Sequence, residues 1–362
     1  MASIKEIKSC EISLASPSLN IPTTPNATLS IKGDIHLLLT ASLKVTQVVV
    51  KLHGYSQIDN SQKVTTRNLT TKDLVKQKIT VVNITKTLNA GENSFPFSIT
   101  IKSPQYLPGS VEGKHAAIRY VLTAELTKAN PHAIHKVTKN VILRKNKLLK
   151  DGKFDINEKE LHEDEREGLL KYKVYVSKYL AIDDDNEVVN NNNINNNEEN
   201  DTTSEPRGVI KVDATFESLD NAGVKEVKVE AFEYEMYNFA KFNSVTGAPP
   251  VAKTTATKKP TTTPSTKSRV GVKIPAFSNL SATNPHQTIP LLTPPLVIPV
   301  SSEASEPVSF EIPIRNRMKL NSNVLFLEIK HEVIMTIRFD KFMLAPLKLE
   351  VPIIVIPRDA CS

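Results

Sequence analysis

Apolar and polar residues alternate along most of the chain, which is the period expected of β-strands that bury one face. Between residues 118 and 126, Ile118, Tyr120 and Leu122 share one face, whereas Arg119 lies on the other. The same alternation predicts further strands at residues 48–52, 97–101, 210–216 and 347–355. Many short strands of this kind, separated by turn residues, predict an all-β sandwich or barrel.

Two later segments depart from simple alternation. The longest run, residues 324–339, has apolar inward positions except for His331. We interpret His331 as a hydrogen-bonded core histidine rather than a metal ligand, because buried polar groups are normally paired. In the segment 226–239, EVKVEAFEYEMYNF, the apolar residues change face near Ala231 and Phe232. Such a change of frame predicts a β-bulge at that point.

The length of 362 residues and the apolar content of 40% favour two domains, since single cores rarely grow beyond about 250–300 residues. The segment 156–170 has helical character but is nearly all charged, so we interpret it as a solvated connection. The predicted organisation is a first sandwich at residues 1–150, a connector at 151–168 and a second sandwich at 169–362.

Two segments within the second sandwich have compositions typical of disorder. Residues 183–206 are acidic and rich in asparagine, so they bury too little apolar surface to offset the entropy of ordering. Residues 243–302 combine a Thr/Pro/Lys tract with an apolar tract spaced by prolines, which favours extended polyproline conformations. We therefore predict two disordered inserts, at about 183–206 and 243–302.

The net charge of +7 is concentrated in one part of the chain. Residues 236–302 contain seven basic residues and no acidic one, and the remainder is formally neutral. A nucleic-acid-binding face needs clustered Lys and Arg on a folded surface, so we expect no nucleic-acid partner. The two cysteines, Cys10 and Cys361, and the absence of a long apolar run predict a cytoplasmic protein without a signal peptide or a membrane span.

Known catalytic and metal-binding motifs are missing from the sequence. The run GSVEG at residues 109–113 does not have the spacing of a nucleophile elbow, and there is no phosphate-binding glycine loop. His132 and His135 have a spacing that metals sometimes use, but no third ligand follows nearby, and a solvated loop is the favoured interpretation. We therefore expect no enzyme activity, no cofactor and no metal site.

One run is more specific than a fold class. Residues 91–126, GENSFPFSITIKSPQYLPGSVEGKHAAIRYVLTAEL, resemble the N-terminal domain of the arrestin family, in the version found in the arrestin domain-containing proteins, or α-arrestins. The segments GVIKVDATFES, EVKVEAFEYEMY, NSNVLFLEIKHEVIMTIRF and LKLEVPIIVI are similar to the arrestin C-terminal domain. The resemblance implies two consecutive immunoglobulin-like, arrestin-type β-sandwich domains.

The resemblance also implies a class of function. Such proteins are non-catalytic adaptors in membrane-protein trafficking and endocytosis, which bind the cytosolic tails of membrane receptors or transporters and bring sorting machinery, often a ubiquitin ligase, to them. We therefore expect a cytoplasmic protein, peripheral at the plasma membrane or endosomes. The alternative is a structural coat or scaffold subunit of a retromer-type sorting complex, which has the same double sandwich.

Candidate binding residues are few. The basic tract formed by Lys253, Lys258, Lys259, Lys267 and Arg269 is a candidate for contact with an anionic membrane surface and for regulation by phosphorylation. Many α-arrestins carry Pro-Pro-x-Tyr motifs, the ligands of WW domains, but this chain has none.

The nearest approach to that motif is the pair Pro104 and Tyr106. It lacks the first proline, so recruitment of a ubiquitin ligase through it is a weak hypothesis beside a structural role for the tyrosine.

Overall fold

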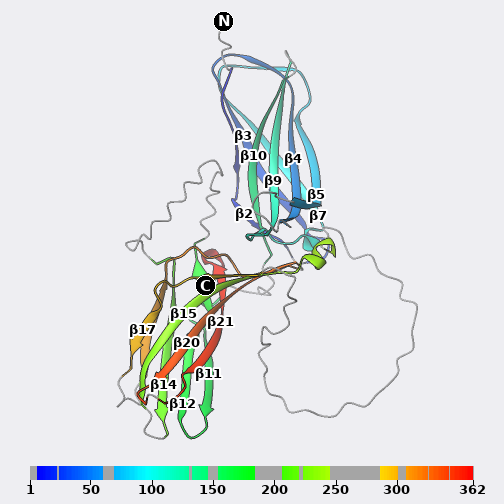
Figure 1. Ribbon diagram of the computed structural model, residues 1–362. Coiled ribbons are helices and arrows are strands. Elements are labelled where there is room, and N and C mark those ends of the chain that lie inside the picture. Colours follow the sequence, from blue (N-terminus) through cyan, green and yellow to red (C-terminus); the bar gives the residue numbers. More distant parts are fainter. Residues whose placement is uncertain are drawn as a thin grey trace, which may run out of the picture.

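The computed structural model describes most of the chain. The described residues are 6–22, 24–59, 69–129, 133–145, 154–183, 206–219, 223–244, 286–300, 307–324, 326–341 and 343–361. Figure 1 shows two β-sandwiches arranged end to end, the first built from the N-terminal strands and the second from the C-terminal ones.

The first sandwich packs a small sheet against a large one. The small sheet has the order β1 (Ile7–Leu14), β3 (Thr28–Leu39), β7 (Gly91–Lys102). The large sheet has the order β2 (Ser18–Asn20), β10 (Ile134–Arg144), β9 (Ala116–Lys128), β4 (Leu43–Asp59), β5 (Leu69–Val82), with β6 (Lys86–Leu88) on β4 and β8 (Val111–Glu112) on β9. The alternating apolar faces of β3, β4, β7 and β9 form the core between them.

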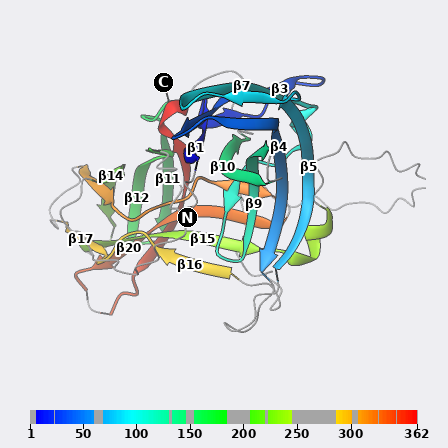
Figure 2. The ribbon, with the colours of Figure 1, turned by 90° about the horizontal axis from the view of Figure 1, so that it is seen from above.

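The second sandwich repeats this plan. Its small sheet has the order β11 (Lys159–Arg166), β12 (Leu170–Ser177), β14 (Gly208–Ser218), β18 (Val308–Ile314). Its large sheet has the order β13 (Tyr179–Ile182), β21 (Leu347–Pro357), β20 (Leu327–Phe339), β15 (Val224–Tyr237), β16 (His286–Pro290), with β17 (Leu296–Pro299) on β15 and β19 (Ser322–Val324) on β20. The two layers are visible from above in Figure 2.

The two halves share an unusual detail. In each, a short strand crosses from the small sheet to the large one and pairs in parallel with the last strand of its half: β2 with β10, and β13 with β21. All other pairs are antiparallel among the described strands. The predicted fold class, all-β with two consecutive sandwiches, is confirmed.

The charged segment 156–170 is not a helix. Residues Lys159–Arg166 form β11, which pairs along its whole length with β12. The charge pattern misled the interpretation because β11 is an edge strand with mostly exposed side chains, and charges on an edge discourage pairing with other chains. The strand lies inside the predicted connector, so the small sheet of the second half begins before residue 169.

The proline-spaced tract near residue 290 also folds. Strands β16 and β17 lie within the predicted insert 243–302 and pair with the two ends of β15. Prolines are tolerated there because both strands lie at the edge of the sheet, where a missing N–H breaks no ladder bond. The 3₁₀ turn η2 (Phe239–Ser244) precedes the remaining part of the predicted insert. Residues 245–285 and 184–205 lie outside the described residues, and disorder there stays a prediction.

The bulge predicted near Ala231 and Phe232 is absent. Strand β15 keeps one register with β20 from Glu226 to Tyr237, and the irregularity lies at Val224 instead. The inward positions after Ala231 are therefore Glu233 and Glu235, and the aromatic residues between them face outward. The sequence pattern looked like a change of frame because two carboxylates occupy buried positions.

Candidate functional site

The two carboxylates lie at the end of β15 that approaches the first sandwich. Glu233 is 1% exposed and Glu235 is fully buried. Burying an ionised carboxylate is unfavourable by several kcal/mol unless charge and hydrogen bonds compensate it. The surroundings of these two residues therefore decide what the site can do.

Lys319 supplies the compensating charge. It lies in the loop after β18, and its Nζ contacts Glu233 Oε1 at 2.9 Å and also donates to Glu235 Oε1. Its backbone N–H donates to Glu233 Oε2 at 2.8 Å. One ammonium therefore bridges both carboxylates, in a geometry that neutralises half of their combined charge.

His331 completes the hydrogen-bonding contacts of the cluster. Asn321 Oδ1 accepts a hydrogen bond from the backbone N–H of Val355 at 2.7 Å, so it also faces His331 Nδ1 as an acceptor, at 2.8 Å. The other ring nitrogen faces Glu233 Oε2 at 3.2 Å. Both ring nitrogens thus face hydrogen-bond partners, as predicted for a satisfied core histidine.

These contacts change the acidity of the groups. Burial opposes ionisation of Glu233, but the hydrogen bond from His331 and the charge and hydrogen bonds of Lys319 outweigh it and lower its pKa to about 2. Burial likewise opposes the charge on Lys319, but its contacts with Glu235 and Glu233 raise its pKa. Glu233 and Lys319 thus remain charged at neutral pH inside the protein.

The cluster is joined directly to the first sandwich. The backbone N–H of Lys114 donates to Glu235 Oε2 at 3.0 Å, and that of His115 donates to the Tyr237 hydroxyl at 3.1 Å. The Tyr237 hydroxyl in turn donates to Glu235 Oε2. The β8–β9 turn is therefore held by side chains of β15.

The close approach of the β8–β9 turn to Tyr237 and Leu327 requires a glycine at position 113. A Cβ on Gly113 would lie 2.9 Å from the Tyr237 hydroxyl and 3.1 Å from Leu327. A larger residue would push the two sandwiches apart at this point. The run GSVEG thus has a structural role at the junction, which its sequence spacing did not reveal.

Apolar side chains surround the cluster. Tyr237, Phe242, Phe326 and Leu327 belong to the second half but pack into the core of the first. The rings of Phe242 and Phe326 meet edge to face at 5.2 Å. Figure 1 shows η2, which contributes Phe242, beneath the lower end of the first sandwich. The carboxylates of Glu233 and Glu235 are thus buried beside apolar side chains at the junction of the two sandwiches.

The arrangement suits a structural role better than a catalytic one. We call the contacts of Glu233, Glu235 and Tyr237 with Lys319, His331 and the β8–β9 turn the latch between the two sandwiches. Both carboxylates accept hydrogen bonds on each oxygen from Lys319, His331, Tyr237 or backbone N–H groups. A general base or nucleophile would need a free lone pair facing a substrate.

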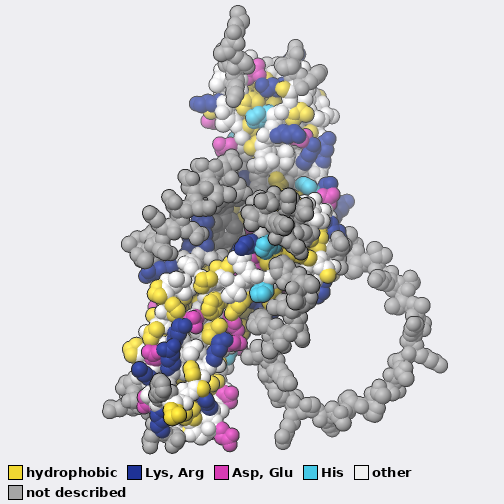
Figure 3. Space-filling model, viewed as in Figure 1, with side chains coloured by type: hydrophobic (Ala, Val, Ile, Leu, Met, Phe, Trp, Pro, Cys, Tyr) yellow, Lys and Arg dark blue, Asp and Glu magenta, His cyan; other side chains and the backbone are white. Residues whose placement is uncertain are grey.

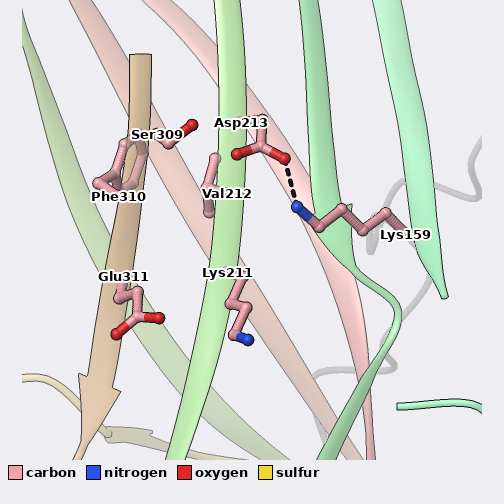
Figure 4. A pocket seen from close by; sticks show the side chains of 7 residues that line it. All are labelled: Lys159, Lys211, Val212, Asp213, Ser309, Phe310 and Glu311. Carbon is pink, nitrogen blue, oxygen red and sulfur yellow. Dashed lines mark hydrogen bonds and ion pairs between the residues drawn. The ribbon is translucent and has the colours of Figure 1, made fainter. Parts of the chain in front are cut away.

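A second, shallow site lies on the small sheet of the second half. A hollow of about 170 Å³ is lined by Lys159, Lys211, Val212, Asp213, Ser309, Phe310 and Glu311. Figure 4 shows that Lys159 reaches across to Asp213, while Lys211 and Glu311 lie side by side on β14 and β18. Because its charges are matched in number and sign, the hollow offers no net attraction for a charged ligand.

The sequence-predicted site residues lie away from this junction cluster. The basic tract from Lys253 to Arg269 lies outside the described residues. Pro104 and Tyr106 form the 3₁₀ turn η1 (Pro104–Tyr106), in which Pro104 is buried. Lys145 Nζ donates to the carbonyl of Gln105 at 2.6 Å, so the turn is tied to the end of β10. Binding of a WW domain there stays a prediction.

Sequence reasoning missed Glu233, Glu235, Tyr237 and Lys319. The sequence did contain a signal for the buried carboxylates, because the alternation of apolar and polar residues breaks after Ala231. Such a break is equally compatible with a β-bulge and with charged residues at buried positions. Lys319 could not be identified because its partners are more than 80 residues away in the chain.

Among the residues the structure describes, no helix is long or apolar enough to cross a membrane.

Comparison with known families matches residues 26–148 to the model described as the arrestin (or S-antigen) N-terminal domain. No curated protein is significantly similar to the chain in sequence. The matched range runs from β3 to β10 and includes the turn that contacts Glu235 and Tyr237. The first sandwich is therefore similar to the arrestin N-terminal domain, and the predicted resemblance to the arrestin family is confirmed over that range.

Proposed function

We propose that the protein is a non-catalytic adaptor in membrane-protein trafficking, which binds cytosolic segments of receptors or transporters and connects them to sorting machinery. The observation that carries the proposal is a domain similar to the arrestin N-terminal domain, latched onto a second sandwich by a buried, saturated charge cluster. Two sandwiches joined in this way form one extended surface of strands and loops, which suits protein recognition rather than turnover.

The finer parts of the proposal come from the chain itself. Lys253, Lys258, Lys259, Lys267 and Arg269 are proposed to contact an anionic membrane surface, where each basic residue near the surface contributes about 1 kcal/mol. The sequence has no Pro-Pro-x-Tyr motif, so a ubiquitin ligase would be recruited through a partner protein or through the degenerate motif at Pro104 and Tyr106. We also propose that the chain is more similar to the α-arrestins than to the visual or β-arrestins.

Proximity labelling in cells tests the adaptor function. The full-length chain is compared with a variant in which residues 246–284 are replaced by a Gly/Ser linker, so that β15 and β16 are retained. Adaptor function predicts enrichment of membrane receptors or transporters and of sorting proteins, and a basic membrane tether predicts weaker enrichment in the variant. Recovery of soluble metabolic enzymes alone, in both samples, would contradict the proposal.

Affinity purification of the full-length chain tests the alternative. A coat or scaffold subunit of a retromer-type complex co-purifies with fixed partners in constant stoichiometry, whereas an adaptor is captured weakly and conditionally. Isolation of one stoichiometric complex without membrane cargo would favour the scaffold.

A further inference from the structure

The outer face of the second large sheet carries an aromatic patch. Because β15 keeps its frame, Phe232, Tyr234 and Met236 point away from the core, on the opposite side from Glu233 and Glu235. The rings of Phe232 and Tyr234 lie 6.1 Å apart. Phe232, Tyr234 and Met236 occupy alternate positions and are half-buried, so they form a contiguous apolar strip on the outside of the strand.

Neighbouring strands extend this patch. Pro290 of β16 lies opposite Phe232, and Pro352 of β21 lies opposite Glu332 of β20. Ile334, two residues along β20 on the same face, is only 8% exposed. Figure 3 shows hydrophobic side chains gathered over the front of the second sandwich, with charged side chains around them. The patch consists of Phe232, Tyr234, Met236, Pro290, Ile334 and Pro352.

The charges around the patch are paired, with one exception. The ion pairs on this face join Glu226 to Arg338, Glu230 to Lys228, Glu328 to Lys330 and Glu350 to Lys348, at 2.8, 2.9, 2.9 and 2.5 Å. Glu332, in the middle of the patch, has no ion pair with any described lysine or arginine. Its hydrogen-bond partner is the hydroxyl of Tyr234.

The surroundings of Glu332 disfavour its negative charge. Burial among apolar neighbours raises its pKa, and the carboxylate of Glu350 adds to this effect, against the opposing hydrogen bond of Tyr234 and the more distant Lys348 and Lys330. A partly desolvated carboxylate that lacks a direct ion pair gains more from an incoming positive charge than a solvated, paired one does.

We propose that this patch is a docking site for an extended protein segment that places an arginine against Glu332, over the rings of Phe232 and Tyr234. A guanidinium suits the site better than an ammonium because it is planar, forms two parallel hydrogen bonds to a carboxylate and stacks on aromatic rings. The flanking apolar residues of the segment would cover Met236 and Pro290, whereas Ile334 is already buried by its neighbours. Strand β16 ends the order of this sheet, so the patch lies beside a sheet edge.

This inference deepens the proposed adaptor function by naming the chemistry of the partner. The two can fail separately, because binding of a peptide in solution does not depend on membrane recruitment in cells. The occupant is a segment of another protein, and a second copy of this chain or its own basic tract are different outcomes of the test.

A random 12-residue phage-displayed library, selected on the immobilised full-length protein, provides the probe. We expect enriched peptides to contain an arginine flanked by apolar residues. A labelled consensus peptide, measured by fluorescence polarisation, should bind at least tenfold more weakly to Glu332→Gln and to Tyr234→Ala. Glu226→Gln, which removes an ion-paired carboxylate from the same face, should change the affinity less than twofold.

Thermal unfolding of each variant separates loss of binding from loss of fold, since Glu332→Gln preserves the size of the side chain and should leave the midpoint unchanged. The proposal is overturned if no peptide is enriched, if the consensus lacks a basic residue, or if Glu332→Gln binds as tightly as the parent. A dimer that Glu332→Gln dissociates in analytical ultracentrifugation would assign the patch to a second copy. Peptide binding that appears only after residues 253–269 are replaced would assign it to this chain's own tract.

Discussion

At the residue scale, the most informative group is His331, whose two ring nitrogens both face acceptors. Replacing it with alanine removes the partners of Asn321 and of the buried carboxylate of Glu233. Removal of one partner of a buried charged network is strongly destabilising because the remaining charge keeps its desolvation penalty.

We predict that His331→Ala lowers the free energy of unfolding by about 2–4 kcal/mol. Lys330→Ala, next to it on β20 but solvent-exposed, should change it by less than about 0.5 kcal/mol. Urea unfolding followed by circular dichroism measures both. Equal midpoints for the two variants would show that the contacts of His331 do not stabilise the fold.

The lowered pKa of Glu233 predicts how the free energy of unfolding depends on pH. Its pKa is about 2 in the folded protein and about 4.5 when unperturbed, so the unfolded chain binds the proton first as pH falls. The stabilisation from Glu233 is therefore complete above about pH 4.5 and is lost as the pH falls toward 2. The total is on the order of 3 kcal/mol.

Glu233→Gln should remove this dependence. The parent protein is expected to lose stability more steeply between pH 5 and 3 than the variant, although the variant is less stable at neutral pH. Urea midpoints at several pH values provide the measurement. Parallel slopes for the two proteins would contradict the assigned pKa of Glu233.

At the element scale, Gly54 shows how closely the strands of the first sandwich pack. It lies in β4 opposite Tyr120 of β9, and a Cβ there would meet the Tyr120 ring at 2.5 Å and Val75 at 2.7 Å. Tyr120 cannot move freely because its hydroxyl donates to the carbonyl of Pro108 at 2.7 Å. The glycine therefore accommodates an aromatic ring rather than a turn.

We predict that Gly54→Ala destabilises the protein by about 1–3 kcal/mol through overpacking, although alanine is otherwise favoured over glycine in a strand. Thr71→Ala, at an exposed position of the adjacent β5, is the matched control and should be nearly neutral. Differential scanning fluorimetry compares the two. A Gly54→Ala variant as stable as the parent would mean that the ring of Tyr120 relocates without penalty.

Strands with one buried face could be predicted from the sequence alone, because alternation reports burial directly. The apolar positions of β9, such as Ile118, Tyr120 and Leu122, are all buried as expected. Strand β11 could not be predicted in this way, because an edge strand with exposed side chains has no apolar face to report. Strand β15 was misread at Glu233 because burial of a charge depends on partners that only the fold brings close.

At the scale of the whole molecule, one junction combines charge, hydrogen bonds and apolar contact. Glu235 and Tyr237 hold the turn before β9, and aromatic residues of the second half complete the core of the first. The sequence predicted two sandwiches but not this latch, whose members come from five separate segments. If the latch is intact, both halves present their strands and loops to a partner as one surface.

The distance between spin labels on the two sandwiches tests this central claim. Labels at Thr100→Cys on β7 and Glu217→Cys on β14, both exposed, are introduced after Cys10→Ser and Cys361→Ser substitutions. Double electron–electron resonance should give one narrow distance distribution for this protein, and a clearly broader one after Glu235→Gln and Tyr237→Phe are added. A broad distribution before those changes, or an unchanged narrow one after them, would contradict the claim that the buried cluster holds the two halves together.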